Sequence, residues 1–244
     1  EEEGIEFLKR LKGMFALAIL DTRRRSLLLA RDQVGMKHLY WGETPDGLVF
    51  ASEARALFAA GLVTARPDWE ALGGFFSVGW VQSPKTAFEG LRRLRPGSYA
   101  LIDEDGVREG RYWVPRYHEP EKHRSEQDYA EELKALLERA LGTHLDADFP
   151  AGLYLSGGWD SSLVSLYASR RANTRLNSYS LVFPDDPSSD ESTFSSQVAQ
   201  QIGSQSHEIE IRDGDILKAL NQTSLALEEP ITTCPTTLGF LLSK

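Results

Sequence analysis

The first half of the chain alternates short apolar runs with turn-forming residues. Apolar runs over Met14–Asp21 and Ser26–Asp32 flank the polar segment 22–25, which predicts a β-hairpin. The runs Lys37–Gly42 and Leu48–Ser52 flank a Pro-Asp-Gly turn signal in the same way. Several of these runs are continuously apolar rather than alternating. We therefore expect their sheets to be covered on both faces.

Two helical patterns and one further strand are predicted in the same half, which makes it an α+β region. They are a short helix over Ile5–Leu11, a helix over Glu53–Ala60 and a strand over Tyr99–Asp103. The aromatic side chains expected in the core are Phe75, Phe76, Trp80 and Trp113.

The second half alternates helical and strand patterns. Ser125 and Asp128 form a capping-box pattern that opens a helix ending near Leu145. The predicted strands that follow are Gly152–Leu155, Asn177–Phe183 and His207–Ile211, and the predicted helices are Ser161–Arg171, Glu191–Ile202 and Asp213–Leu227. A β-α-β-α-β-α series predicts an α/β fold with a parallel sheet and helices on its faces.

Composition and charge support two domains of different character. The chain has 244 residues, 41% hydrophobic and 26% charged, which excludes disordered and collagen-like classes. Residues 1–118 carry 17 basic and 16 acidic residues, a net charge of +1, whereas residues 119–244 carry 10 and 20, a net charge of −10. The segment Pro115–Ser125 between them reads as a linker. The acidic balance argues against a nucleic-acid surface or a basic membrane anchor.

The single cysteine, Cys234, excludes an intrachain disulfide and is typical of a reducing, cytoplasmic compartment. No signal peptide or membrane-spanning run is visible. The chain does not begin with Met and ends inside a helical pattern, so we expect a fragment of a longer protein.

The clearest chemical motif is the stretch Leu155-Ser156-Gly157-Gly158-Trp159-Asp160-Ser161-Ser162, between a predicted strand and a predicted helix. Glycines allow close backbone approach to an anion, and the amides of a helix start carry partial positive charge. Asp160 would repel a phosphate unless a cation lay between them, which predicts a Mg²⁺ ligand. The competing interpretation is a Gly-Gly turn with a serine helix cap. No Gly-Lys-Ser or Gly-Lys-Thr Walker sequence is present.

This loop resembles the pyrophosphate loop of the N-type ATP pyrophosphatases, and the rest of the chain narrows the resemblance to glutamine-hydrolysing asparagine synthetases. The stretches that carry it are Gly13-Met14-Phe15-Ala16-Leu17-Ala18 with Asp21, Ala30-Arg31-Asp32-Gln33-Val34-Gly35-Met36-Lys37-His38-Leu39-Tyr40, Ala51-Ser52-Glu53 and Arg95-Pro96-Gly97-Ser98-Tyr99.

The resemblance implies that residues 1–118 are the C-terminal portion of an Ntn-hydrolase-like glutaminase β-sandwich. Residues 119–244 would be the N-terminal portion of an ATP-pyrophosphatase synthetase domain, both domains being incomplete. The implied reaction uses ATP and Mg²⁺ to convert aspartate to β-aspartyl-AMP, which ammonia from glutamine then attacks. The implied partners are small molecules, with a homodimer as a further expectation. The implied ATP and pyrophosphate contacts are Leu155, Ser156, Gly157, Gly158, Asp160, Ser161, Ser162 and Leu181, with Asp160 also binding Mg²⁺.

Several positions depart from the family pattern. The family's nucleophilic cysteine stands at the mature N-terminus, whereas this chain opens with Glu1, and its glutamine-binding residues lie upstream of this sequence. Trp159 replaces the usual Leu, and His38 the usual Pro. The second synthetase loop would follow Lys244. Glu228-Glu229-Pro230 aligns with an acidic-Pro segment near the aspartate site, with Glu228 in place of the commoner Asp.

Other readings stay open at this point. β-Lactam synthetases and lasso-peptide cyclases resemble the same family but adenylate a different carboxylate, and exopolysaccharide-associated amidotransferases are a further alternative. A tRNA-modifying enzyme shares the loop, but the charge of −10 in that half argues against RNA binding. A pseudo-enzyme that binds nucleotide without turnover is the non-catalytic alternative. Asp190-Glu191 is interpreted as a helix cap rather than a binding pair.

Overall fold

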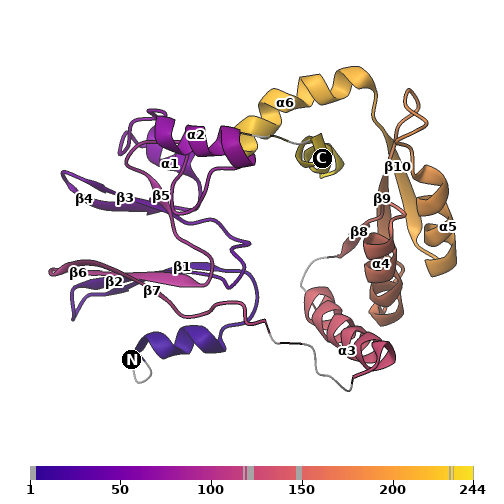
Figure 1. The fold of residues 1–244 in the computed structure, drawn as a ribbon, viewed down its shortest axis with the longest axis horizontal. Helices are drawn as coiled ribbons and strands as arrows, with labels where there is room; N and C mark the ends of the chain where they lie inside the picture. The colour runs from indigo at the N-terminus through magenta and orange to yellow at the C-terminus, as the bar shows by residue number, and fades with distance from the viewer. Residues whose placement is uncertain are drawn as a thin grey trace. The chain divides into compact units, whose positions relative to one another are not determined.

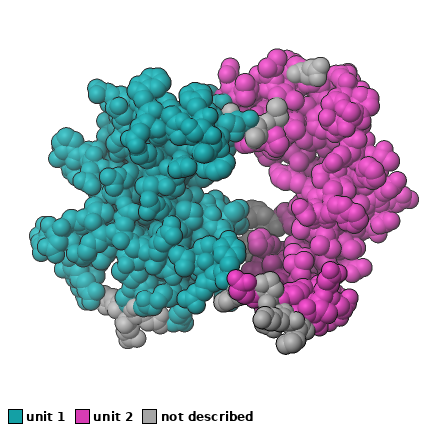
Figure 2. All heavy atoms as spheres, viewed as in Figure 1, with its two compact units in different colours: residues 1–117, 224–232 teal, residues 118–223, 233–244 magenta. Residues whose placement is uncertain are grey.

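The computed structural model describes residues 4–117, 119, 124–146, 150–230, 232 and 234–243, without the side chains of Asp213 and Cys234. The chain divides into two compact units (Figure 2). Unit 1 contains residues 1–117 and 224–232, and unit 2 contains residues 118–223 and 233–244. Most of the predicted linker after residue 117 lies outside the described residues. None of the described helices combines the length and apolarity needed to cross a membrane.

Unit 1 contains two antiparallel sheets (Figure 1). The first has the order β1 (Ala16–Asp21), β2 (Ser26–Arg31), β6 (Ser98–Asp103) and β7 (Gly106–Arg111). The second has the order β4 (Gly47–Ala51), β3 (Tyr40–Thr44) and β5 (Arg92–Arg93). The helical segments are η1 (Gly4–Arg10), a 3₁₀ helix, and the α-helices α1 (Ala54–Ala59) and α2 (Trp69–Val78). The predicted hairpin is confirmed, with Asp21 paired to Ser26.

The two sheets face each other and share a core, while helices lie on their outer faces (Figure 1). Neighbouring residues of one strand show this directly. Leu29 packs between the sheets and Ala30 packs against η1, and both are fully buried. In β3, Trp41 packs between the sheets and Tyr40 packs against α1, and both are 2% exposed. This explains why these strands are continuously apolar: both faces are covered.

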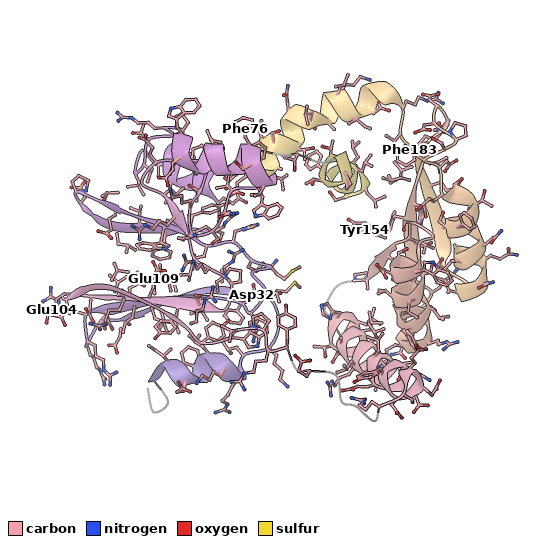
Figure 3. The ribbon with its side chains drawn as sticks, in the orientation of Figure 1. Asp32, Phe76, Glu104, Glu109, Tyr154 and Phe183 are labelled. Atoms are coloured by element: carbon pink, nitrogen blue, oxygen red, sulfur yellow. The ribbon has the colours of Figure 1, made fainter. Side chains whose placement is uncertain are left out.

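The prediction of two covered faces is wrong for the outer part of β1, an edge strand, where Ile19 and Leu20 are 46% and 68% exposed. The prediction that all four aromatic residues are core is also wrong. Phe75 is 9% exposed, but Phe76 points away from α2 and is 83% exposed (Figure 3). Trp80 and Trp113 are exposed as well. Helix α2 presents only one apolar side to the unit, so the other stays in solvent.

Unit 2 contains the predicted parallel sheet. Its order is β10 (Gln205–Glu210), β9 (Asn177–Val182) and β8 (Gly152–Tyr154), and both pairings are parallel. Its helices are α3 (Glu126–Leu145), α4 (Trp159–Arg171), α5 (Ser192–Ile202), α6 (Asp213–Leu227) and α7 (Cys234–Leu242), of which the last four residues of α6 belong to unit 1. The capping box at the start of α3 is confirmed, because the Asp128 amide donates to Ser125 Oγ and the Ser125 amide donates to the Asp128 carboxylate.

One face of this sheet carries the core of unit 2. Leu153 on β8 packs with Ala168 of α4 and with Leu176, just before β9. Alternation along the strand places Tyr154 on the opposite face, where it is 58% exposed (Figure 3). The sheet therefore holds α4 on one face and directs the chain after Tyr154 into the turn that begins this helix.

Candidate functional site

The candidate site is the turn between β8 and α4, at the carboxyl end of a parallel strand. Gly157 has φ of +87°, a backbone region that residues with a Cβ rarely adopt. A Cβ at this position would lie 2.7 Å from Phe194 Cβ and 2.7 Å from the Ser195 amide nitrogen. Both neighbours belong to the start of α5. The glycine is therefore required by the close approach of the turn to that helix.

A network of serine hydroxyls fixes the shape of this turn. Ser156 Oγ and Ser161 Oγ lie 2.9 Å apart, and the Ser156 amide donates to Ser161 Oγ at 3.3 Å. The Gly158 amide donates to Ser156 Oγ at 3.2 Å, and Ser161 Oγ donates to the Gly158 carbonyl at 3.2 Å. Two of the three loop hydroxyls are thus joined in one internal network. This network fixes the turn but does not cap the helix, because α4 has no side-chain cap hydrogen bond.

Other groups of the turn are left without a protein acceptor among the described residues. Helix α4 begins after Gly158, which has no side chain to cap it, so the first-turn amides point outward. Ser162 Oγ is buried and makes no hydrogen bond in the described part of the chain. Asp160 lies in the first helical turn and is exposed. Outward amides and an exposed carboxylate fit an anion accompanied by a divalent cation.

The two predicted leucine contacts are placed differently from the serines. The Leu155 side chain is 1% exposed, its amide donates to the Tyr179 carbonyl at 2.9 Å, and its carbonyl accepts from Ser180 Oγ at 2.7 Å. Leu181 is half-buried on β9 and pairs with Ile209. Since Tyr154 pairs with Tyr179, alternation places Leu155 and Leu181 on opposite faces of the sheet. The structure therefore brings the loop residues together but separates the two leucine side chains.

The acidic pair before α5 agrees with the capping interpretation. Asp190 accepts hydrogen bonds from the Ser192 amide at 2.9 Å and from Ser192 Oγ at 3.0 Å. Glu191, at the N-cap position, makes no side-chain cap. The Asp190 carboxylate, just before α5, thus accepts hydrogen bonds from the first residue of that helix.

Unit 1 contains a buried polar turn within the stretch 30–40 that carries the family resemblance, where sequence patterns assigned no role to Asp32 or Arg31. Asp32, 1% exposed, accepts hydrogen bonds from the amides of Met36 and Lys37, both at 2.9 Å, and from that of Phe15 at 3.4 Å. Burial alone would raise the pKa of Asp32, but backbone hydrogen bonds, with Lys37 the strongest, place the pKa below its usual value. The Asp32 carboxylate therefore holds this turn as a hydrogen-bond acceptor.

Arg31, directly before it, is 4% exposed and donates to three backbone carbonyls, those of Gly35, Lys37 and Leu94. His38 Nδ1 lies 3.2 Å from Arg31 Nη2. Burial and the positive charge of Arg31 lower the pKa of His38, so the imidazole is kept neutral beside the guanidinium. His38 thus completes a polar cluster with Arg31. The described part of the chain contains no group of three or more His, Cys, Asp or Glu side chains that could hold a metal ion.

Comparison with known proteins divides the chain into two matches. Residues 1–113 match the family described as glutamine amidotransferase domain, and residues 132–244 match asparagine synthase. A putative glutamine-hydrolysing asparagine synthetase of Mycobacterium bovis is 33% identical over 93% of this chain and 36% of its own length. An amidase (chry2) of Gibberella zeae is 30% identical over 93% of this chain and 36% of its own length.

A third relative, asparagine synthetase [glutamine-hydrolyzing] 3 of Bacillus subtilis, is 28% identical over 90% of this chain and 38% of its own length. This chain therefore spans little more than a third of the length of each of these three relatives. Among solved structures, a glutamine phosphoribosylpyrophosphate amidotransferase from B. subtilis aligns with a TM-score of 0.33 and 16% identity over 85% of this chain and 35% of that chain. A likeness at that level carries no argument about this fold.

Proposed function

This chain belongs to the family of glutamine-hydrolysing asparagine synthetases, which joins a glutamine amidotransferase domain to an asparagine synthase domain, and on that premise we propose what the whole protein does. The proposed reaction is the ATP-dependent amidation of aspartate to asparagine. The aspartate β-carboxylate displaces pyrophosphate from the α-phosphorus of ATP to give β-aspartyl-AMP. Ammonia released from glutamine attacks the acyl carbon, and AMP leaves.

The observation that carries the proposal is the turn 155–162 with its spare hydrogen-bond donors. The first-turn amides of α4, which no side chain caps, are donors available to an anionic acceptor, and the buried Ser162 Oγ has no partner among the described residues. Donors fixed before the substrate arrives stabilise the charge that develops on the departing pyrophosphate. The internal Ser156–Ser161 contact fixes the loop in this shape without using those donors.

In this proposal the pyrophosphate of ATP binds to the residues of the turn, with Asp160 as the carboxylate that holds Mg²⁺. When bound, Mg²⁺ offsets the charge between the phosphates and the Asp160 carboxylate. The residues proposed to contact the phosphates are Ser156, Gly157, Gly158, Ser161 and Ser162. Leu155 and Leu181 stay predicted nucleotide neighbours, the first through its backbone because its side chain is buried.

We also propose the division of the chain at residue 118 between the glutaminase and synthetase portions, an Ntn-hydrolase-type sandwich for the first, and a cytoplasmic location. The two facing sheets of unit 1 support the sandwich. A homodimer stays a prediction.

The test uses the full-length protein and measures pyrophosphate release from ATP with and without aspartate, first with ammonium and then with glutamine. Release that requires aspartate is the expected result. Asp160→Ala should abolish it, whereas the matched control Glu131→Ala, an exposed acid on α3, should not. Release that is unchanged in Asp160→Ala would remove the role assigned to that carboxylate.

A second candidate function follows from the relative named an amidase, which is almost as similar to this chain as the M. bovis synthetase. In this alternative the same loop adenylates a carboxylate other than aspartate. A panel of amino-acid and small-acid acceptors in the same pyrophosphate assay separates the two. Release with another acid, and none with aspartate, would replace asparagine synthesis by this alternative.

A further inference from the structure

Residues 224–232 lie in the stretch that matches asparagine synthase but belong to the compact unit 1, which contains the amidotransferase match. The same helix α6 supplies both units, since its residues 213–223 belong to unit 2. The chain also returns to unit 2 at residue 233. The segment 224–232 therefore matches asparagine synthase in sequence but packs within the unit that contains the amidotransferase match. Two acidic side chains, Glu228 and Glu229, attach it there.

The first attachment is the carboxylate of Glu228, which caps helix α1. Glu228 Oε2 accepts from the Ala54 amide at 2.6 Å, and Oε1 accepts from the Arg55 amide at 2.7 Å. Helix α1 has no cap of its own, because the Glu53 side chain makes no cap hydrogen bond and instead pairs with Arg55. A carboxylate on the first-turn amides satisfies two orphan donors and complements the helix dipole. A residue 174 positions away thus provides the cap.

The backbone of Glu228 is held in an unfavourable region. Its φ is +60°, where residues other than glycine are uncommon. Its side chain is nevertheless 7% exposed, fully occupied by the two amides of α1. Backbone strain of this kind persists where surrounding contacts hold it. Here the capping contacts are those that hold it.

The second attachment is an ion pair between Glu229 and Arg93 of β5. Glu229 Oε1 lies 2.7 Å from Arg93 Nη1, and the two side chains are only 18% and 12% exposed. Arg93 also donates to the Val81 carbonyl at 3.2 Å. Burial raises the pKa of Glu229, and the Arg93 charge opposes that change. Removing either partner would leave a buried charge without its counter-charge.

Apolar packing contributes less to this attachment than these charges do. Phe58, Phe88, Leu225 and Pro230 border a cavity of about 480 Å³ at the same place. Leu225 is 70% exposed. Phe58 and Phe88 pack edge-to-face against each other, with ring centroids 4.7 Å apart, whereas Leu225 of the segment is open to solvent. The polar contacts of Glu228 and Glu229 therefore hold the segment, with Thr232 Oγ1 donating to the Gly79 carbonyl at 3.0 Å as a third contact.

We propose that Glu228 and Glu229 are positioning residues that couple the release of ammonia in unit 1 to its use by the synthetase portion. They act by fixing the end of α6 to α1 and to Arg93. This inference rests on the proposed function, because it assumes that one protein releases ammonia and consumes it. It adds two residues whose role is coupling rather than chemistry.

The test uses the full-length protein and three rates: glutamate released from glutamine, amide product formed with ammonium, and amide product formed with glutamine. The variants are Glu229→Gln, Glu228→Gln and the doubly neutral Arg93→Gln/Glu229→Gln, which leaves no buried charge unpaired. The matched control is Glu70→Gln, which breaks an exposed ion pair with Lys85 in the same unit. Melting temperatures identify variants that fail to fold.

We expect the amide product per glutamate to fall about fivefold or more in the Glu228 and Glu229 variants, the range typical of coupling between sites. The ammonium-driven rate should fall less than the glutamine-driven rate in the same variant, since that route does not need ammonia from glutamine. Equal losses in the two rates would assign Glu228 and Glu229 to aspartate binding and overturn the coupling role. A product-to-glutamate ratio equal to wild type, or a uniform loss of all three rates in the folded doubly neutral variant, would overturn the inference. A wild-type protein that forms no amide even with ammonium would instead overturn the proposed function.

Discussion

Gly157 and Phe194 approach each other so closely that no Cβ fits at position 157 without moving one of them: the two would be 2.7 Å apart. This contact joins the candidate phosphate loop to the first turn of α5. Because φ of Gly157 is also positive, both space and backbone geometry demand glycine.

Gly157→Ala should therefore destabilise unit 2 by about 1–3 kcal/mol and abolish ATP binding. Gly158→Ala is the matched control for stability, because its added Cβ meets only Ser156 Oγ at 3.3 Å and φ is −68°. Chemical unfolding of the two variants, with calorimetric ATP titration of Gly157→Ala against wild type, checks the expectation. Equal stability of the two variants, with wild-type ATP affinity in Gly157→Ala, would show that the close approach is unimportant.

Asp32→Asn should destabilise unit 1 by about 3 kcal/mol, because an amide cannot accept all the backbone hydrogen bonds that the buried carboxylate accepts. The pKa of Asp32 is below its ordinary value of 3.8, so the contribution of its charge is complete above that value. The difference in unfolding free energy between wild type and Asp32→Asn should shrink as the pH falls below 3.8, because the wild-type carboxylate becomes protonated once the pH reaches its lowered pKa. Urea unfolding at neutral and acid pH measures this. A difference that does not depend on pH would contradict it.

Trp159→Leu should leave stability unchanged within about 0.5 kcal/mol, because the side chain is 95% exposed in the first turn of α4. If ATP binds to this turn, tryptophan emission should change on addition of ATP and Mg²⁺, and that change should be lost in the variant. Trp69→Leu, an exposed tryptophan of unit 1, should keep the response. The reverse result would place the nucleotide elsewhere.

Ser125→Ala should cost about 1 kcal/mol of stability, the usual effect of losing a helix cap. The loss removes the acceptor of the Asp128 amide, 3.2 Å away, at the start of α3. Thermal unfolding followed by circular dichroism would detect it. Ser169→Ala in α4 is a suitable comparison, since its hydroxyl donates to a helix carbonyl rather than capping an end, and it should cost less.

Local patterns in the sequence predicted most of the elements because each was determined by nearby residues. The hairpin of β1 and β2, the capping box of α3 and the alternation in unit 2 are examples. Helix α2 was missed because Gly73-Gly74 lies inside it, and its ends are fixed instead by the Asp68 cap and by Gly79 with positive φ.

Other features depend on contacts that no local pattern contains. Strand β7 was missed because it is a largely polar edge strand, where Val107 is one of few apolar residues. The loop serines were predicted from their motif, but the need for glycine at 157 also depends on Phe194, which lies on another helix. The cap that Glu228 provides to Ala54 joins residues 174 positions apart, a distance that only the folded chain shows.

The chain passes between the two units after residues 117, 223 and 232. A recombination event that exchanges everything beyond residue 118 would replace both Glu228, which caps α1, and Glu229, which pairs with Arg93. A second half taken from another protein would therefore need acids at both positions that reach α1 and Arg93. For anyone building chimeras from this family, the compatible exchange unit is the sequence after residue 118 with segment 224–232 restored from the host.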